Sequence, residues 1–248
     1  MAGPEAAPRA AFYAAPGGKG GWRDWWTVLH PPYTAWHLGY VVIGACLAPT
    51  VSTAVLVASL VAFFLAVGVA AHALDELNDR PLRTGIASGS LVAVTAVSLT
   101  GAVALGALGI SRVGWGLVAF MVVGVGLVVG YNLELIGGRL HNDVTFALAW
   151  GAFPVLVGYY AQAHSISLAA VAGAVGAFGL SQAQRRLSTP ARDLRRRAGV
   201  VEGRITYEGG RTEPIGRSGL LAPLEAALSA MSWAVVALAL ALALERLG

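Results

Sequence analysis

Residues 38–71 read LGYVVIGACLAPTVSTAVLVASLVAFFLAVGVAA, and this stretch decides the fold class. It contains no Asp, Glu, Lys, Arg or His. A helix needs about 20 consecutive apolar residues to cross the hydrocarbon core of a bilayer. The stretch is too long for one such helix, and Pro49 followed by Thr50 divides it. It therefore predicts two consecutive membrane-spanning helices.

Similar runs without charged residues follow along the rest of the chain. Only 12% of the 248 residues are charged, whereas an ordinary soluble domain has about 25%. We therefore expect an all-α, multi-pass transmembrane bundle. The seven expected spans are residues 33–48, 51–77, 84–110, 114–135, 143–163, 165–187 and 221–247.

The segments outside these spans complete the expected domain organisation. The Ala-, Pro- and Gly-rich start of the chain has no apolar signal-peptide region, so we expect a disordered tail. The Gly-Gly pair at residues 209–210 follows an alternating segment, which is typical of a small hairpin. The expected parts are a tail over 1–25, a six-helix membrane core over 26–189, a basic cytoplasmic loop over 190–217 and a last transmembrane helix over 218–248.

The basic residues predict the orientation of the chain. With the N-terminus in the cytoplasm, the outside segments hold only Arg112 and Arg246 of the 17 Lys and Arg. Cytoplasmic loops carry the excess of Lys and Arg, so this split predicts a cytoplasmic N-terminus and an external C-terminus. The net charge of +4 does not indicate nucleic acid, because the basic residues lie between spans and form no recognised binding motif. Membrane lipid is the expected surrounding partner, and no protein partner is indicated.

The richest polar cluster lies at the cytoplasmic end of the second expected span. On a helix, His72, Asp75 and Asp79 fall at i, i+3 and i+7 and share one face. Two carboxylates one turn apart can share Mg²⁺, which also takes waters and substrate phosphates. Arg80 and Arg83 follow, and arginine suits bidentate contact with phosphate. This pattern indicates a metal-diphosphate site; the alternative is a set of headgroup-level charges that pair with each other.

Two further polar clusters fall on the same side of the membrane under this topology. One precedes the fifth expected span, and the other ends the sixth. Their candidate substrate-binding residues are Tyr131, Asn132, Asp143, Gln182, Arg185 and Arg186. Asp143 also fits a simple helix cap, and paired arginines at a span end also serve topology alone.

The order of these clusters resembles the UbiA-type intramembrane prenyltransferase superfamily. That family has an Asn-Asp-x-x-Asp-x-x-x-Asp motif at the end of helix two. Residues 71–79, AHALDELND, keep its last two Asp as Asp75 and Asp79, while Ala71 and His72 replace the first two positions. RPLRTG at 80–85, HPP at 30–32, YN at 131–132 and AWGAFP at 149–154 are also similar to family signatures.

The resemblance covers roughly residues 28–190 and implies a fold and a function. It implies helices around a central cavity that opens laterally to lipid, and Mg²⁺-assisted transfer of a prenyl group from a polyprenyl diphosphate. Asp75 and Asp79 would hold the metal. His72 would bind a phosphate oxygen or act as an acid–base group.

The chain also departs from the family pattern at the end of its sixth span. The family has a second Asp-rich motif there, whereas residues 181–189 read SQAQRRLST without an acid. One Mg²⁺ is therefore expected rather than two, with arginines Arg80, Arg83, Arg185 and Arg186 as diphosphate ligands. The expected function is a prenyltransferase or terpene cyclase. The alternative is a non-catalytic protein of the same fold that binds an isoprenoid or another lipid.

Two other classes of membrane protein are disfavoured. The Asp-Gly…Ala-Arg spacing of CDP-alcohol phosphotransferases is absent from the sequence. The sequence also shows no inverted repeat of the kind that many transporters contain.

Overall fold

The computed structural model describes residues 11–15 and 20–248, and most of these residues are helical. The helices α1 to α6 are Trp22–Leu29, Pro31–Cys46, Thr53–Phe63, His72–Leu77, Ser88–Val113 and Gly116–Asn132; α7 to α10 are Asp143–Ala147, Phe153–Ala163, Leu168–Arg196 and Arg217–Leu247. Two π-helical segments, η1 (Phe64–Ala71) and η2 (Leu148–Ala152), join α3 to α4 and α7 to α8.

Four helices of the described chain are long and apolar enough to cross a membrane. They are Thr53–Leu77, Ser88–Val113, Asp143–Ala163 and Arg217–Leu247. They indicate an integral membrane protein. Each of the three other expected spans also contains a helix, but α2 has 16 residues, α6 has 17, and α9 ends in a charged segment. The count of seven spans and the orientation of the termini stay predictions.

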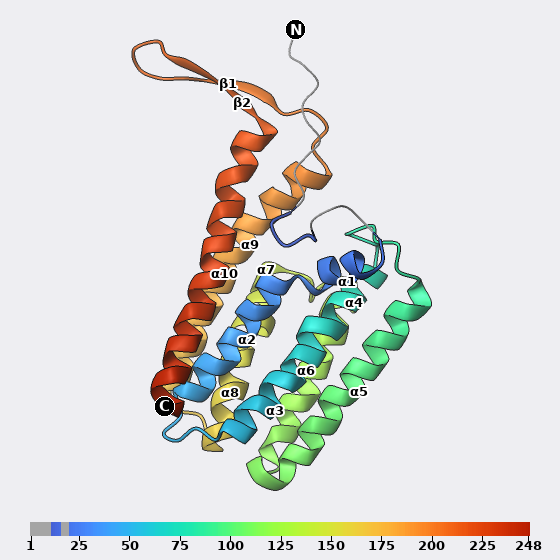
Figure 1. The fold of residues 1–248 in the computed structure, drawn as a ribbon, viewed down its shortest axis with the longest axis vertical. Coiled ribbons are helices and arrows are strands. Elements are labelled where there is room, and N and C mark those ends of the chain that lie inside the picture. Colours follow the sequence, from blue (N-terminus) through green and yellow to red (C-terminus); the bar gives the residue numbers. More distant parts are fainter. Residues whose placement is uncertain (1–10, 16–19) are drawn as a thin grey trace.

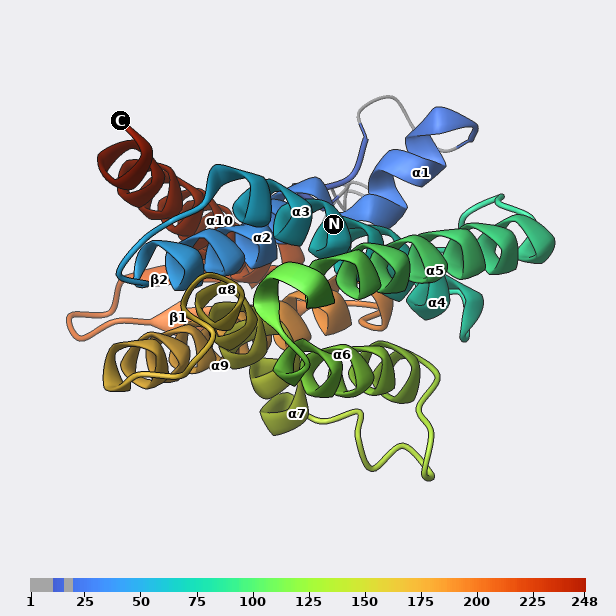
Figure 2. The same cartoon turned by 90° about the horizontal axis from the view of Figure 1, so that it is seen from below.

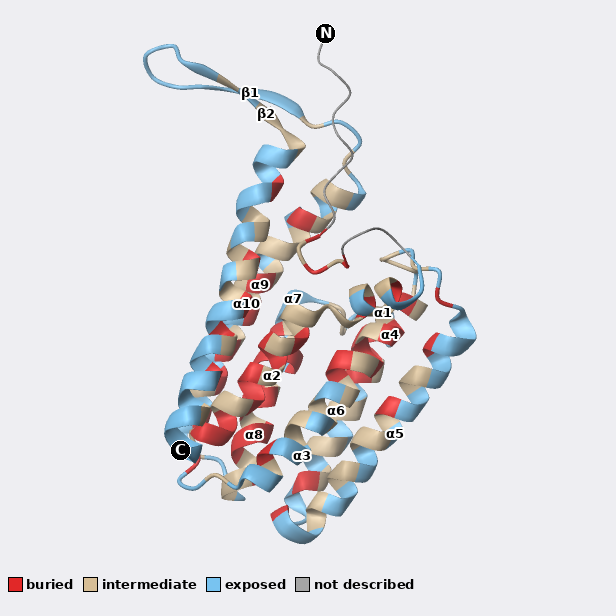
Figure 3. Ribbon diagram, viewed as in Figure 1, coloured by how far each residue is buried: buried red, intermediate tan, exposed pale blue. Residues whose placement is uncertain are grey.

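The helices lie in two rows when the bundle is seen along its length. One row contains α10, α2, α3 and α5, and the other contains α9, α8 and α6 (Figure 2). Buried residues gather on α2, α8 and η2 at the centre, whereas the outer faces of α5 and α10 are exposed (Figure 3). Apolar side chains such as Leu108 and Leu244 are exposed on those outer faces. This distribution is the one expected where lipid covers the outside of a bundle.

The centre of the bundle depends on a close approach between α2 and α8. A Cβ atom at Gly44 would lie 2.1 Å from the Val155 carbonyl oxygen, and one at Gly158 would lie 2.3 Å from the Val41 carbonyl oxygen. Small residues permit such backbone contacts between membrane helices. Trp36 and Tyr40 then pack beside this crossing against Val155.

The segment that was expected to be one basic loop contains two kinds of structure. α9 does not end before Pro190 but continues to Arg196, so the loop prediction is wrong over its first turns. The strands β1 (Glu202–Thr206) and β2 (Thr212–Gly216) then form an antiparallel hairpin, which confirms the hairpin prediction. The hairpin projects beyond the ends of α9 and α10, at the opposite end of α10 from the C-terminus (Figure 1).

The expected disordered tail, residues 1–25, lies only partly within the described residues. Residues 1–10 and 16–19 lie outside the described residues. Residues 11–15 pack against the bundle, with Ala11, Tyr13 and Ala15 buried. The first helix begins at Trp22 rather than after residue 25.

We predict that Gly44→Ala destabilises the protein strongly, because its new methyl group meets backbone rather than a side chain that can turn aside. Overpacking of this kind costs about 1–3 kcal/mol or more. Gly176→Ala on α9 is the matched control, because a Cβ atom there meets nothing within 4 Å. Thermal unfolding in detergent measures both variants, and equal melting temperatures for them would contradict the close approach.

Candidate functional site

A polar cavity of about 430 Å³ lies at the end of the bundle, between α4 and the charged end of α9. It collects polar side chains from segments far apart in the sequence. The sequence-predicted residues that line it are His72, Asp75, Asp79, Tyr131, Asn132 and Arg185. The cavity therefore brings together members of all three predicted clusters. Arg80, Arg83, Asp143, Gln182 and Arg186 are not among its lining residues.

The α4 wall of the cavity carries His72 and Asp75 on one helical turn. His72 Nδ1 lies 3.0 Å from the Gly68 carbonyl oxygen. A carbonyl oxygen only accepts, so Nδ1 carries a proton, and in the neutral ring Nε2 then has the lone pair. Asp79 does not share this helical face, because α4 ends at Leu77 and Asp79 has a left-handed backbone with φ of 69°. The expectation that Asp79 shares a helix face with His72 and Asp75 is therefore wrong, although Asp79 still lines the cavity.

A buried carboxylate fixes the turn that follows α4. Glu76 is fully buried and accepts hydrogen bonds from the Leu82 amide at 2.9 Å and the Thr84 amide at 2.8 Å. The Thr84 hydroxyl donates to it as well, at 2.7 Å. Arg80 points into the same turn, where it donates to the Ile86 carbonyl oxygen at 2.6 Å and to Ser88 Oγ at 2.5 Å. Glu76 and Arg80 thus hold the backbone around Asp79, and Arg80 is engaged away from the cavity.

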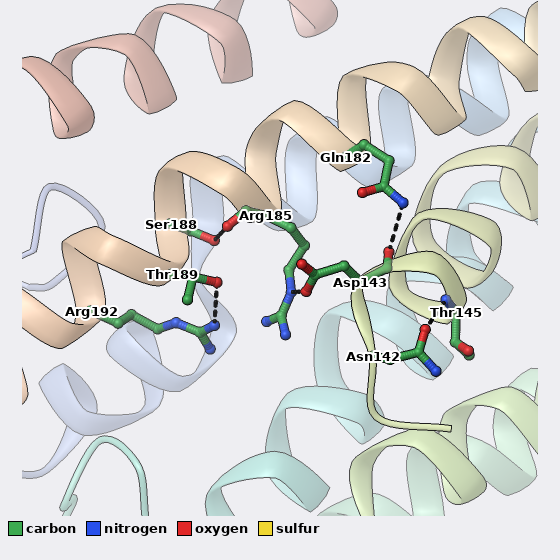
Figure 4. A network of polar contacts seen from close by, with 8 residues as sticks. All are labelled: Asn142, Asp143, Thr145, Gln182, Arg185, Ser188, Thr189 and Arg192. Atoms are coloured by element: carbon green, nitrogen blue, oxygen red, sulfur yellow. Dashed lines mark hydrogen bonds and ion pairs between the residues drawn. The ribbon is translucent and has the colours of Figure 1, made fainter. Parts of the chain in front are cut away.

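The opposite wall begins where α9 meets the start of α7. Arg185 Nε donates to Asp143 Oδ1 at 2.9 Å, and its guanidinium lies 5.2 Å from the centre of the Phe146 ring. Gln182 donates to the Asp143 backbone oxygen at 3.2 Å (Figure 4). The cap of α7 is Asn142, whose side chain accepts from the Thr145 amide. Asp143 is therefore the ion-pair partner of Arg185 rather than the helix cap.

The continuation of α9 beyond Pro190 adds arginines that the sequence analysis assigned to a loop. Arg185, Arg192 and Arg196 stand at i, i+7 and i+11, a spacing that keeps them near one helix face, and all three line the cavity. Their heptad-like spacing was the signal that could have identified them. Arg186, by contrast, is exposed and is not a lining residue of the cavity.

Arg192 contacts a hydroxyl group rather than a carboxylate. It donates to Thr189 Oγ1 at 3.3 Å, and no carboxylate in the described part of the chain forms an ion pair with it. Burial lowers the pKa of its guanidinium, and nearby Arg185 and Arg196 lower that pKa further, whereas Asp75 acts in the opposite direction. Like charges held together away from bulk water repel strongly. The arrangement therefore favours an anion in the cavity.

Aromatic rings also line this cavity. Trp150 lies 5.9 Å from Tyr131, centre to centre, and Tyr131 lies 6.2 Å from Phe146. His37 Nδ1, at 2.8 Å from the Trp150 carbonyl oxygen, fixes the π-helical segment η2. π-helical turns are frequent at functional sites. The sequence analysis did not identify His37, which lies far from Trp150 in the chain.

The chain was compared with protein-family models, with curated proteins and with solved structures. None of them matches it.

We predict that Glu76→Gln lowers stability, because the amide group must turn its NH₂ toward a backbone donor and leave that donor unsatisfied. A buried unsatisfied group costs about 1–3 kcal/mol. Glu208→Gln, an identical change at an exposed hairpin residue, is expected to be neutral. Unfolding of both variants in detergent measures the difference. No loss of stability for Glu76→Gln would contradict the structural role.

Proposed function

We propose that this protein is an intramembrane transferase that ionises an isoprenoid diphosphate. The observation that carries the proposal is one cavity lined by Arg185 and Arg192 from α9, by His72 and Asp75 from α4, and by aromatic rings. Arginine binds phosphate oxygens through paired N–H donors. The resemblance to UbiA-type prenyltransferases, which stays a prediction, supports the same chemistry.

The apolar part of the substrate has a space of its own. A second cavity of about 270 Å³ lies among α3, η1, α5, α6 and α8 and is lined mainly by aliphatic residues. Val67 and Trp150 line both cavities. An isoprenoid chain would pass these two residues with its diphosphate toward α9. This geometry suits an amphiphile with an anionic head better than a free phosphate.

In the proposed reaction, the carbon–oxygen bond to the diphosphate breaks and its electron pair leaves with the diphosphate. Arg185 and Arg192 stabilise that departing charge, and fixed charges act most strongly where water is excluded. The remaining allylic cation lies against the faces of Trp150 and Tyr131, which attract cations. An acceptor captures the cation, or an internal double bond does in a cyclase. His72 Nε2, with its free lone pair, accepts the proton that is released.

We expect this site to take one magnesium ion rather than two. In the part of the chain that the structure describes, no group of three His, Cys, Asp or Glu has metal-binding spacing. Asp75 and Asp79 nevertheless line the same cavity, and Mg²⁺ needs only one or two carboxylates when phosphates and waters complete its shell. Asp75 and Asp79 would hold that ion, which neutralises diphosphate charge when bound.

One observation favours a non-catalytic alternative. The α9 wall carries arginine and glutamine where the related pattern would have carboxylates, and Arg185 is already paired with Asp143 at 2.9 Å. Such a wall would retain an anionic lipid without ionising it. Under this alternative the protein binds or carries an isoprenoid diphosphate and releases no diphosphate.

We predict that the purified protein releases diphosphate from farnesyl or geranylgeranyl diphosphate in the presence of Mg²⁺. Asp75→Asn and Arg192→Gln should each lower kcat/KM by about 10²–10³, the usual effect of removing one electrostatic contact. Arg186→Gln is the matched control outside the cavity and should leave the rate unchanged. An enzyme-coupled diphosphate assay measures these rates.

Two results of this assay would contradict the proposed transferase site. If folded wild-type protein binds these diphosphates but releases none across several chain lengths, the carrier function replaces the transferase. If release occurs but is equal in Arg192→Gln and Arg186→Gln, the cavity is not the reaction site.

A further inference from the structure

Residues 11–15, here named the N-terminal strap, lie against the polar cavity although they precede every expected span. Phe12 and Tyr13 line the cavity, and Tyr13 is only 6% exposed. The strap runs between α9 and α1 at the end of the bundle that carries the hairpin (Figure 1). The Ala15 amide donates to Thr27 Oγ1 at 3.3 Å, which ties the end of the strap to α1.

Aromatic contacts hold the strap over the site. The Tyr13 ring lies 4.3 Å from the His30 ring, and the His30 ring lies 4.8 Å from the His72 ring. Phe12 packs 5.5 Å from Tyr33, beside the contact between α9 and α10. The His30 ring therefore lies between Tyr13 and His72, the predicted acid–base residue.

The hydroxyl oxygen of Tyr13 accepts a hydrogen bond from Arg196. Arg196 Nη2 lies 3.4 Å from it, and a guanidinium group only donates. The phenol oxygen accepts, so its own proton is available to another acceptor. Among the described residues, none accepts a hydrogen bond from this hydroxyl. Arg195 is also close: burial lowers the pKa of its guanidinium, and Tyr13 acts in the opposite direction.

We infer that the N-terminal strap is a wall of the anion site and that the Tyr13 hydroxyl donates a hydrogen bond to the bound phosphate group. Arg196 orients this hydroxyl by donating to its oxygen, and Phe12 keeps the strap in place. This inference rests on the anion binding of the proposed function and not on turnover. It gives residues 11–15 a role as a specificity-determining element.

The test uses farnesyl S-thiolodiphosphate, a poorly ionising analogue, and full-length protein in detergent. Tyr13→Phe keeps the ring and removes only the hydroxyl, so folding and the ring contacts should persist. A hydrogen bond to a charged group is worth about 1.5–3 kcal/mol, and the Kd should therefore rise about tenfold or more. Tyr207→Phe is the matched control, since it removes a hydroxyl from the exposed hairpin, where it donates to Glu213.

A second variant tests the strap itself. Phe12→Ala retains the Tyr13 hydroxyl but loosens the strap, so the analogue should dissociate faster than from wild-type protein. If Tyr13→Phe and Phe12→Ala bind and release the analogue as wild type does, the strap is not part of the site. If wild-type protein does not bind the analogue, the proposed function fails first, and the two failures are thereby distinguished.

Discussion

The guanidinium groups of Arg185, Arg192 and Arg196 face one cavity, and their mutual repulsion constrains the rest of the site. The protein compensates part of this charge along α9. Asp143 pairs with Arg185 at 2.9 Å, and Glu225 pairs with the neighbouring Arg195. Arg192 is left with a hydroxyl partner and the influence of Asp75. An anionic group bound in the cavity would relieve this excess of positive charge.

The surrounding elements fix the positions of the residues that line this cavity. Glu76 fixes the turn after α4 and so sets where Asp79 stands. α2 and α8 cross closely at Gly44, and His37 of α2 contacts the Trp150 carbonyl oxygen. His37 and Trp150 both line the cavity. The apolar cavity beyond Trp150 offers room for a hydrocarbon chain. The polar cavity and the apolar cavity thus adjoin at Val67 and Trp150, which line both.

The sequence predicted the helical runs well and the site only in part. Apolar runs such as 84–110 locate α5 (Ser88–Val113), because length and hydropathy are local properties. Pro190 suggested the end of a helix, but Ala191 packs with Leu221 and Leu228 of α10, and this packing keeps α9 helical. The burial of Glu76 and the contact of Tyr13 with Arg196 depend on the tertiary fold, so local patterns could not reveal them.

The most direct measurement is an experimental structure of the protein bound to farnesyl S-thiolodiphosphate. We expect diphosphate oxygens within hydrogen-bond distance of the Arg192 and Arg185 guanidinium groups. We also expect the isoprenoid chain to pass Trp150 and enter the apolar cavity. A diphosphate bound elsewhere, or a cavity in which Arg192 contacts no anion while the analogue is present, would contradict the proposed site.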